Sequence, residues 1–323
     1  MATVQVATLA MATRFELILH GPNPTALRAA GEEALAEIQR LDATLSAYRP
    51  ESEISALNRS AGTAPVRVSP EVFRLIQHAI LLSQATQGAF DVTVGPLLQA
   101  WGFVQGTGHF PDPTQLASAR ACVGAHLLEC DADSFSIRLA HPQTRIDLGS
   151  IGKGYALDRA EITLREAGVC HALLHGGTST AIAFGNPADA EAWKVAIAHP
   201  NPQIATPAAV VHLQEESLSV SAITGKGFTR DGTFYGHVID PRTGYPASGA
   251  TLAAVVLPSA TESDALSTAL LVRASEMVDC LRQAQAPIRC LVGSPSPDLH
   301  QIEWSHHQLP PLTHSQPGIG PFK

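Results

Sequence analysis

Residues 25–45 carry the strongest structural pattern in this sequence, that of a long amphipathic helix. Ala34, Ile38 and Leu41 recur at the spacing that brings apolar side chains onto one helical face. Residues 4–20, just before it, alternate between polar and apolar side chains as strands do. A helix with one apolar face must bury that face against a sheet or other helices. The chain therefore builds a layered fold that contains both helices and strands.

Further helices and strands are predicted along the rest of the chain. A second helix is predicted over 70–86, with Ser69 in the N-cap position and Pro70 in the first turn. Residues 144–168 are predicted to run from a strand through a glycine turn into a third helix, and a fourth helix is predicted over 262–284. Residues 46–62 are predicted to be a polar loop. Short strands are predicted at 122–129 and 134–139 within an otherwise irregular stretch over 110–145, at 171–175, 180–184, 193–198, 251–258 and 288–292, and in a hairpin-like region over 208–240.

The order of these segments indicates one domain. No repeat of fixed period and no clear linker divides the chain. We therefore predict a single α+β domain over residues 1–294, with mixed sheets and flanking helices. The Pro-, His- and Ser-rich segment 295–323 is predicted to be an irregular C-terminal tail.

Charge and composition exclude several classes of function. The formal net charge is −8 and Lys and Arg form no dense run, so nucleic acid and anionic membranes are poor candidate partners. No stretch of about 18 apolar residues is present, which predicts no transmembrane segment. The first residues lack the basic and apolar regions of a signal peptide, so the expected location is the cytoplasm. The five cysteines show no CxxC spacing, which argues against a disulfide framework and a closed zinc site.

Asp264 and Thr268 form the first candidate functional group. They lie four residues apart at the start of the helix predicted over 262–284, so they share one helical face. A carboxylate and a hydroxyl are suitable oxygen ligands for Mg²⁺. The alternative is that Asp264 stabilises the N-terminus of its own helix through the helix dipole, while Thr268 merely packs.

The segment His237-Val-Ile-Asp-Pro-Arg-Thr-Gly-Tyr-Pro presents several polar groups on a constrained backbone. Arg242 is suited to pair with a phosphate, and His237 can move a proton near neutral pH. The alternative is purely structural, because Asp-Pro-Arg-Thr-Gly is also a good β-turn sequence.

Glycines and aromatic residues mark the remaining candidates. Residues 146–155 place three glycines and Lys153 between a predicted strand and helix, where backbone amides and a cation can face an anion, although the spacing is neither a Walker A loop nor a GxGxxG fingerprint. Residues 45–58 and 88–103 set aromatic side chains beside polar groups, which suits a flat ring ligand. Structural glycine turns and ordinary buried aromatic residues remain the alternatives.

Taken together, these segments resemble the ApbE-like family of FAD:protein FMN transferases over about 11–272. The family order is present: M-x-T-x-F, LSxYxxxSEISxLN, GxFDVTVGPLLxxWGF, IDLGSIxKGYALDRA, GHVIDPRTGYP and the Asp-Ala-Leu-x-Thr helix. The resemblance implies Mg²⁺-dependent cleavage of FAD, with transfer of FMN to a Ser or Thr hydroxyl of an acceptor flavoprotein and release of AMP. A Mg²⁺-dependent FAD pyrophosphatase, in which water replaces that hydroxyl, and a non-catalytic FAD-binding protein are the alternatives.

The resemblance also implies residue roles. The expected metal ligands are the side chains of Asp264 and Thr268 and the backbone carbonyls of Ser150 and Ser267. His237 is the expected general base, with Asp264 as a second candidate, and Arg242 is expected to stabilise phosphoryl charge. The residues expected to contact FAD are Met11, Tyr48, Ala89, Phe90, Asp91, Asp147, Lys153 and Ile239.

Three positions depart from the family pattern. Residues 220–222 read Val-Ser-Ala where Thr-Ser-Gly is usual, Thr178 follows the paired glycines where Asp or Asn is frequent, and Ala12 replaces a common Gly. None of these changes removes a proposed metal side-chain ligand. Many relatives are exported and lipid-anchored, which contrasts with the cytoplasmic location expected here.

Overall fold

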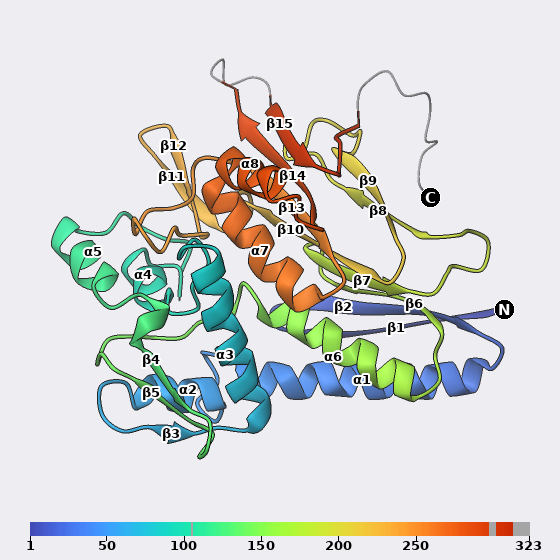
Figure 1. The fold of residues 1–323 in the computed structure, drawn as a ribbon, viewed down its shortest axis with the longest axis horizontal. Helices are drawn as coiled ribbons and strands as arrows, with labels where there is room; N and C mark the ends of the chain where they lie inside the picture. The colour runs from blue at the N-terminus through green and yellow to red at the C-terminus, as the bar shows by residue number, and fades with distance from the viewer. Residues whose placement is uncertain (105, 297–301, 313–323) are drawn as a thin grey trace.

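A large antiparallel sheet organises the computed structural model, which describes residues 1–104, 106–296 and 302–312 (Figure 1). Its strand order is β1-β2-β6-β7-β10-β13-β14-β15. The strands are β1 (Ala2–Ala10), β2 (Thr13–Gly21), β6 (His171–Gly176), β7 (Thr180–Phe184), β10 (Glu216–Ala222), β13 (Leu252–Leu257), β14 (Arg289–Pro295) and β15 (Ile302–His307). Each named strand pair is antiparallel, and the parallel pairings found in the described part of the chain are the isolated bridges Val94–Arg145 and Cys290–Gln308.

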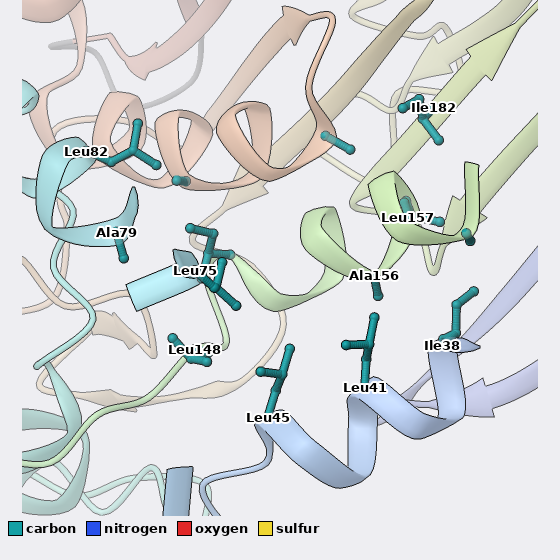
Figure 2. Close-up of a cluster of buried hydrophobic side chains, with 14 of the residues drawn as sticks. Ile38, Leu41, Leu45, Leu75, Ala79, Leu82, Leu148, Ala156, Leu157 and Ile182 are labelled. Carbon is teal, nitrogen blue, oxygen red and sulfur yellow. The ribbon is translucent and has the colours of Figure 1, made fainter. Parts of the chain in front are cut away.

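Three helices cover one face of this sheet, namely α1 (Pro24–Leu45), α6 (Gly152–Glu166) and α7 (Ala260–Arg273) (Figure 1). Leu41 of α1 is fully buried and points toward Ala156 of α6 (Figure 2). Ile38 and Leu45 lie on the same side of α1, so the predicted apolar stripe is the face that packs against the neighbouring helix.

We expect Leu41→Ala to lower the free energy of unfolding by about 2–5 kcal/mol, because it leaves a cavity between α1 and α6. Urea denaturation measures this effect. Leu81→Ala is the matched control: Leu81 is 61% exposed, so its loss should change stability by no more than about 0.5 kcal/mol. Equal losses in the two variants would contradict the packing described here.

The other face of the sheet carries the hairpin of β8 (Trp193–Ile197) and β9 (Ala209–Leu213). Successive side chains of β13 point to opposite faces of the sheet. Ala253 and Val255 pack with the helices, whereas Ala254 packs with Trp193 of the hairpin. The domain therefore has three layers, with the sheet in the middle.

Most of the remaining elements form a smaller lobe beside the large sheet (Figure 1). They are α2 (Glu53–Arg59), β3 (Val66–Arg67), α3 (Pro70–Ala85), α4 (Gly95–Ala100), α5 (Pro113–Arg120), a 3-10 turn (Ala125–Leu127), β4 (Leu128–Asp131), β5 (Ser136–Leu139), and the hairpin of β11 (Gly227–Arg230) and β12 (Thr233–Gly236). Helix α8 (Ser275–Gln283) lies apart from this lobe and packs against β14 and β15. No helix in the described residues has both the length and the apolar character needed to cross a membrane.

The predicted α+β class is confirmed, as are helices α1 and α3 and the Ser69 cap of α3. The prediction of a polar loop over 46–62 is wrong in part, because residues 53–59 form helix α2. Ile54 and Leu57 lie on this helix and are buried. The irregular stretch predicted over 110–145 contains α5, whose first amides are capped by Asp112.

Three other boundaries also differ from prediction. The strand predicted at 122–129 begins only at Leu128, after the 3-10 turn. The helix predicted over 262–284 is two helices, because Ala274 adopts φ 51° and interrupts it. The tail predicted to be irregular contains β15, which pairs with β14, while residues 297–301 and 313–323 lie outside the described residues.

Candidate active site

A cleft of about 980 Å³ gathers most of the predicted site residues. Its volume lies in the range typical of ligand sites. Asp264 and Thr268 reach it from the helical layer, whereas Leu173 of β6 and Val195 of β8 reach it from the side of the sheet that carries the β8–β9 hairpin. The predicted residues that line the cleft are Tyr48, Ala89, Phe90, Asp91, Asp147, Ser150, Lys153, His237, Ile239, Asp264 and Thr268.

Asp264 is only 4% exposed and sits at the junction of three elements. Its Oδ2 accepts a hydrogen bond from the Gly154 amide (3.1 Å) and lies 3.6 Å from Lys153 Nζ. Its Oδ1 accepts a long hydrogen bond from Thr180 Oγ1 (3.3 Å). The N-terminus of α7 is capped by Ser259 instead, so Asp264 does not cap its own helix. A buried carboxylate with one nearby ammonium group can take a further cation.

The predicted metal ligands are hard oxygen donors of the kind that Mg²⁺ prefers. Thr268 Oγ1 has only long contacts, 3.4 Å to the Asp264 carbonyl and 3.4 Å to Ser221 Oγ, so it can turn toward a ligand. Ser150 lines the cleft just before α6. Ser267 is fully buried, and its hydroxyl donates to the Asp264 carbonyl (2.9 Å).

No group of three or more His, Cys, Asp or Glu side chains in the described residues is arranged to hold a metal. A cation in this cleft would therefore depend on Asp264, the Thr268 hydroxyl and main-chain carbonyls. That donor set fits magnesium better than a transition metal, which favours nitrogen or sulfur ligands.

Tyr48 presents a flat apolar surface to the cleft. Its side chain is 60% exposed, yet its hydroxyl donates to Asp147 Oδ2 (2.8 Å), and the other Asp147 oxygen accepts from the Gly149 amide (2.8 Å). Burial of the hydroxyl and the Asp147 charge both raise the pKa of Tyr48, so it stays a neutral donor. The ring is thus held in place while its face remains open to a stacking ligand.

Asp91 shapes the cleft wall from inside the protein. Its buried carboxylate accepts hydrogen bonds from Ser83 Oγ (3.0 Å), Thr93 N (2.8 Å), Thr93 Oγ1 (2.6 Å) and the Ala125 amide (2.8 Å). These donors leave the side chain little capacity for a ligand. Asp91 therefore fixes the loop on which Ala89 and Phe90 lie against the cleft.

His237 is the predicted general base, and its imidazole lines the cleft. Its Nδ1 lies 3.2 Å from the Lys226 carbonyl oxygen, which can only accept, so Nδ1 carries a proton and Nε2 is left as the basic nitrogen. Burial lowers the pKa of His237, the Lys226 carbonyl opposes this, and the charges of Lys226 and Lys153 lower the pKa further. The imidazole is thus kept neutral near pH 7.

Three predicted residues, Ser267, Arg242 and Met11, do not line the cleft. Arg242 donates to both carboxylate oxygens of Asp240 (2.9 Å each), so the structure shows its guanidinium engaged within the turn. Met11 has a left-handed backbone (φ 49°), and its amide donates to Asp42 (2.9 Å). Stabilisation of phosphoryl charge by Arg242 and contact of Met11 with FAD stay predictions.

Several polar residues that line the cleft were not predicted from the sequence, among them Lys226, Thr180 and Ser221. Ser221 Oγ lies 2.8 Å from Ser267 Oγ. Ser221 belongs to residues 220–222, which depart from the family pattern, and that departure was the one sequence feature that could have pointed to it. Lys226 donates to the Phe103 carbonyl. It is a single lysine in a glycine-rich stretch, and nothing in its sequence context marked it.

Comparison with known proteins identifies the family. The ApbE family model matches residues 11–292. The chain belongs to the ApbE family. Relatives named FAD:protein FMN transferase come from Treponema pallidum (31% identity; 82% of this chain and 77% of the relative covered) and Vibrio cholerae (30%; 79% and 77%). The family predicted from the sequence is thereby confirmed.

Solved structures of ApbE proteins share the fold. The protein from Thermotoga maritima superposes with a TM-score of 0.85 at 26% identity, covering 94% of this chain and 97% of that one. The flavinyl transferase ApbE from Pseudomonas stutzeri, in its apo form, gives a TM-score of 0.82 at 27% identity and covers 94% of each chain. The ApbE fold predicted from the sequence is thus confirmed over nearly the whole chain.

Proposed function

We propose that this chain is an FAD:protein FMN transferase, which cleaves FAD and attaches FMN to a Ser or Thr hydroxyl of an acceptor flavoprotein. The observation that carries the proposal is the buried Asp264, set beside Lys153 and Thr268 in the same cleft as the neutral His237. Relatives named for this activity support it.

Magnesium is the proposed cofactor, held by Asp264, Thr268 and the carbonyls of Ser150 and Ser267. When bound, Mg²⁺ would neutralise charge that develops on the phosphoryl oxygens. The chain itself contributes Lys153, whose ammonium group is positioned to hold the pyrophosphate. It also contributes the open face of Tyr48, on which a ring of FAD can stack.

The proposed transfer requires one proton to move. The acceptor hydroxyl oxygen forms a bond to the FMN phosphorus, and the bond from that phosphorus to the AMP oxygen breaks. His237 Nε2 takes the hydroxyl proton, and AMP leaves with the electron pair of the broken bond. The Lys226 carbonyl holds the imidazole in the tautomer that this step needs.

Purified protein incubated with FAD and MgCl₂, with EDTA as the control, tests the proposal when AMP, FMN and acceptor-bound flavin are followed by chromatography. The transferase predicts AMP and flavin-labelled acceptor only when metal is present. Free FMN and AMP with an unlabelled acceptor would indicate a pyrophosphatase. Intact FAD in every tube would indicate a binding protein.

Replacement of Lys226 should change the pH dependence of the reaction. The charges that act on His237 are those of Lys226 and Lys153, and each lowers its pKa. Lys226→Met removes one of them, so the pKa of His237 should rise and the acid limb of the kcat/KM profile should move to higher pH. Lys226→Arg keeps the charge and should leave the limb in place. Coincident limbs in the two variants would contradict His237 as the base.

A further inference from the structure

Helices α6 and α7 cap one another through two aspartates. Asp158 of α6 receives hydrogen bonds from the first turn of α7: its Oδ1 from the Ala260 amide (2.7 Å), and its Oδ2 from the Thr261 amide (2.9 Å), Thr261 Oγ1 (2.6 Å) and Ser259 Oγ (2.9 Å). A carboxylate at a helix N-terminus is stabilised by the free amides and the helix dipole. Asp158 therefore ties the start of α7 to the middle of α6.

Asp264 of α7 makes the return contact. Its Oδ2 accepts from the Gly154 amide (3.1 Å) in the first turn of α6. The N-cap residue of α6, Ile151, has no side chain able to accept that bond. The proposed metal ligand is thus also the cap of the neighbouring helix, and its position depends on how α7 sits against α6.

The two helices are in backbone contact at this point. A Cβ added at Gly154 would overlap the Ala260 carbonyl oxygen, so the approach requires glycine at this position. Lys153 and Ser150 belong to the α6 side of this junction, while Asp264 and Thr268 belong to α7. A small slide of one helix would therefore separate the groups that line the cleft.

We propose that Asp158 is a positioning residue that fixes α7 against α6 and so sets the geometry of the divalent-cation site. This inference rests on the proposed function for the identity of the metal. Asp158 does not line the cleft and acts only through Asp264 and Thr268. Ser259 already caps α7 locally by accepting from the Glu262 amide (3.3 Å), so helix formation does not require Asp158. What Asp158 adds is the placement of the helix.

Asp158→Asn tests the inference with little change of shape. Asparagine offers one acceptor oxygen where four groups donate, and its NH₂ would face donors. Calorimetric titration with MgCl₂, without FAD, should show the dissociation constant rising roughly 10- to 100-fold, as is typical when a residue that orients a metal ligand is lost. Hydrogen–deuterium exchange at the Gly154 amide, without metal, should become faster.

Asp112→Asn is the matched control. Asp112 also caps a helix, accepting from the Thr114 and Gln115 amides at the start of α5, and it does not line the cleft. This variant should leave both the Mg²⁺ affinity and the Gly154 exchange unchanged. Thr261→Val, which removes one donor to Asp158, should shift both measurements in the same direction as Asp158→Asn but by less, and it serves if that variant does not fold.

Wild-type Mg²⁺ affinity and unchanged Gly154 exchange in Asp158→Asn would overturn the positioning role. Equal effects in Asp158→Asn and Asp112→Asn would also overturn it, because they would reflect general destabilisation. A wild-type protein that binds Mg²⁺ but transfers no FMN would contradict the proposed function alone. A wild-type protein that binds no Mg²⁺ would overturn the metal site together with this inference.

Discussion

Asp264→Asn is expected to lower FMN transfer by at least about 10³-fold while the protein remains folded. The substitution keeps the size of the side chain and one acceptor oxygen, so the bond from the Gly154 amide can persist. It removes the charge that would hold Mg²⁺ beside Lys153. AMP release at saturating MgCl₂ measures the loss.

Glu262→Gln provides the matched control on the same helix. Glu262 is a half-buried acid whose side chain lies 3.2 Å from His78 Nε2, and it does not line the cleft. Its replacement should leave AMP release close to the wild-type rate. If Asp264→Asn released AMP and FMN as fast as this control does, the assignment of Asp264 to the metal would be wrong.

His237→Ala should lower kcat by about 10²- to 10⁴-fold, because proton removal from the attacking hydroxyl would lose its base. FAD affinity should change far less, since the imidazole is assigned to the acceptor hydroxyl and not to FAD. Single-turnover transfer rates and a fluorescence titration with FAD measure the two quantities separately. The acid limb of the pH profile should also disappear.

His212→Ala is the control for this substitution, since His212 is an exposed histidine on β9 that does not line the cleft. It should transfer FMN at the wild-type rate. Equal losses of FAD affinity and turnover in His237→Ala would instead assign His237 to substrate binding, and another group would have to serve as the base.

The periodicity of apolar residues predicted the helices that have one long apolar face. It did not predict helices whose burial depends on distant parts of the chain. Helix α1 was predictable because its stripe runs over six turns of sequence without interruption. Helix α2 was not, because it is short and only Ile54 and Leu57 mark its buried side within a polar segment. The break between α7 and α8 occurs at Ala274, and alanine is a strong helix former that gives no stop signal.

Some residues of the site could likewise be predicted from the sequence, and others could not. Residues within compact motifs, such as Lys153 and His237, line the cleft as expected. Arg242 does not, because the turn that presents it also supplies Asp240 as a partner, so the β-turn alternative describes this residue better. For Asp264, the structure shows a contact that neither reading of the sequence included: the amide it caps belongs to α6, and this contact depends on the packing of two helices.

Intact-mass measurement of an acceptor protein distinguishes transfer of FMN to a hydroxyl from simple hydrolysis of FAD. The acceptor and a version with its Ser or Thr replaced by Ala would each be incubated with this protein, FAD and MgCl₂. We expect only the hydroxyl-bearing acceptor to gain the mass of one FMN, in step with AMP release, and we expect EDTA to prevent the gain. AMP and FMN released at the same rate with both acceptors, and no gain in mass, would contradict it.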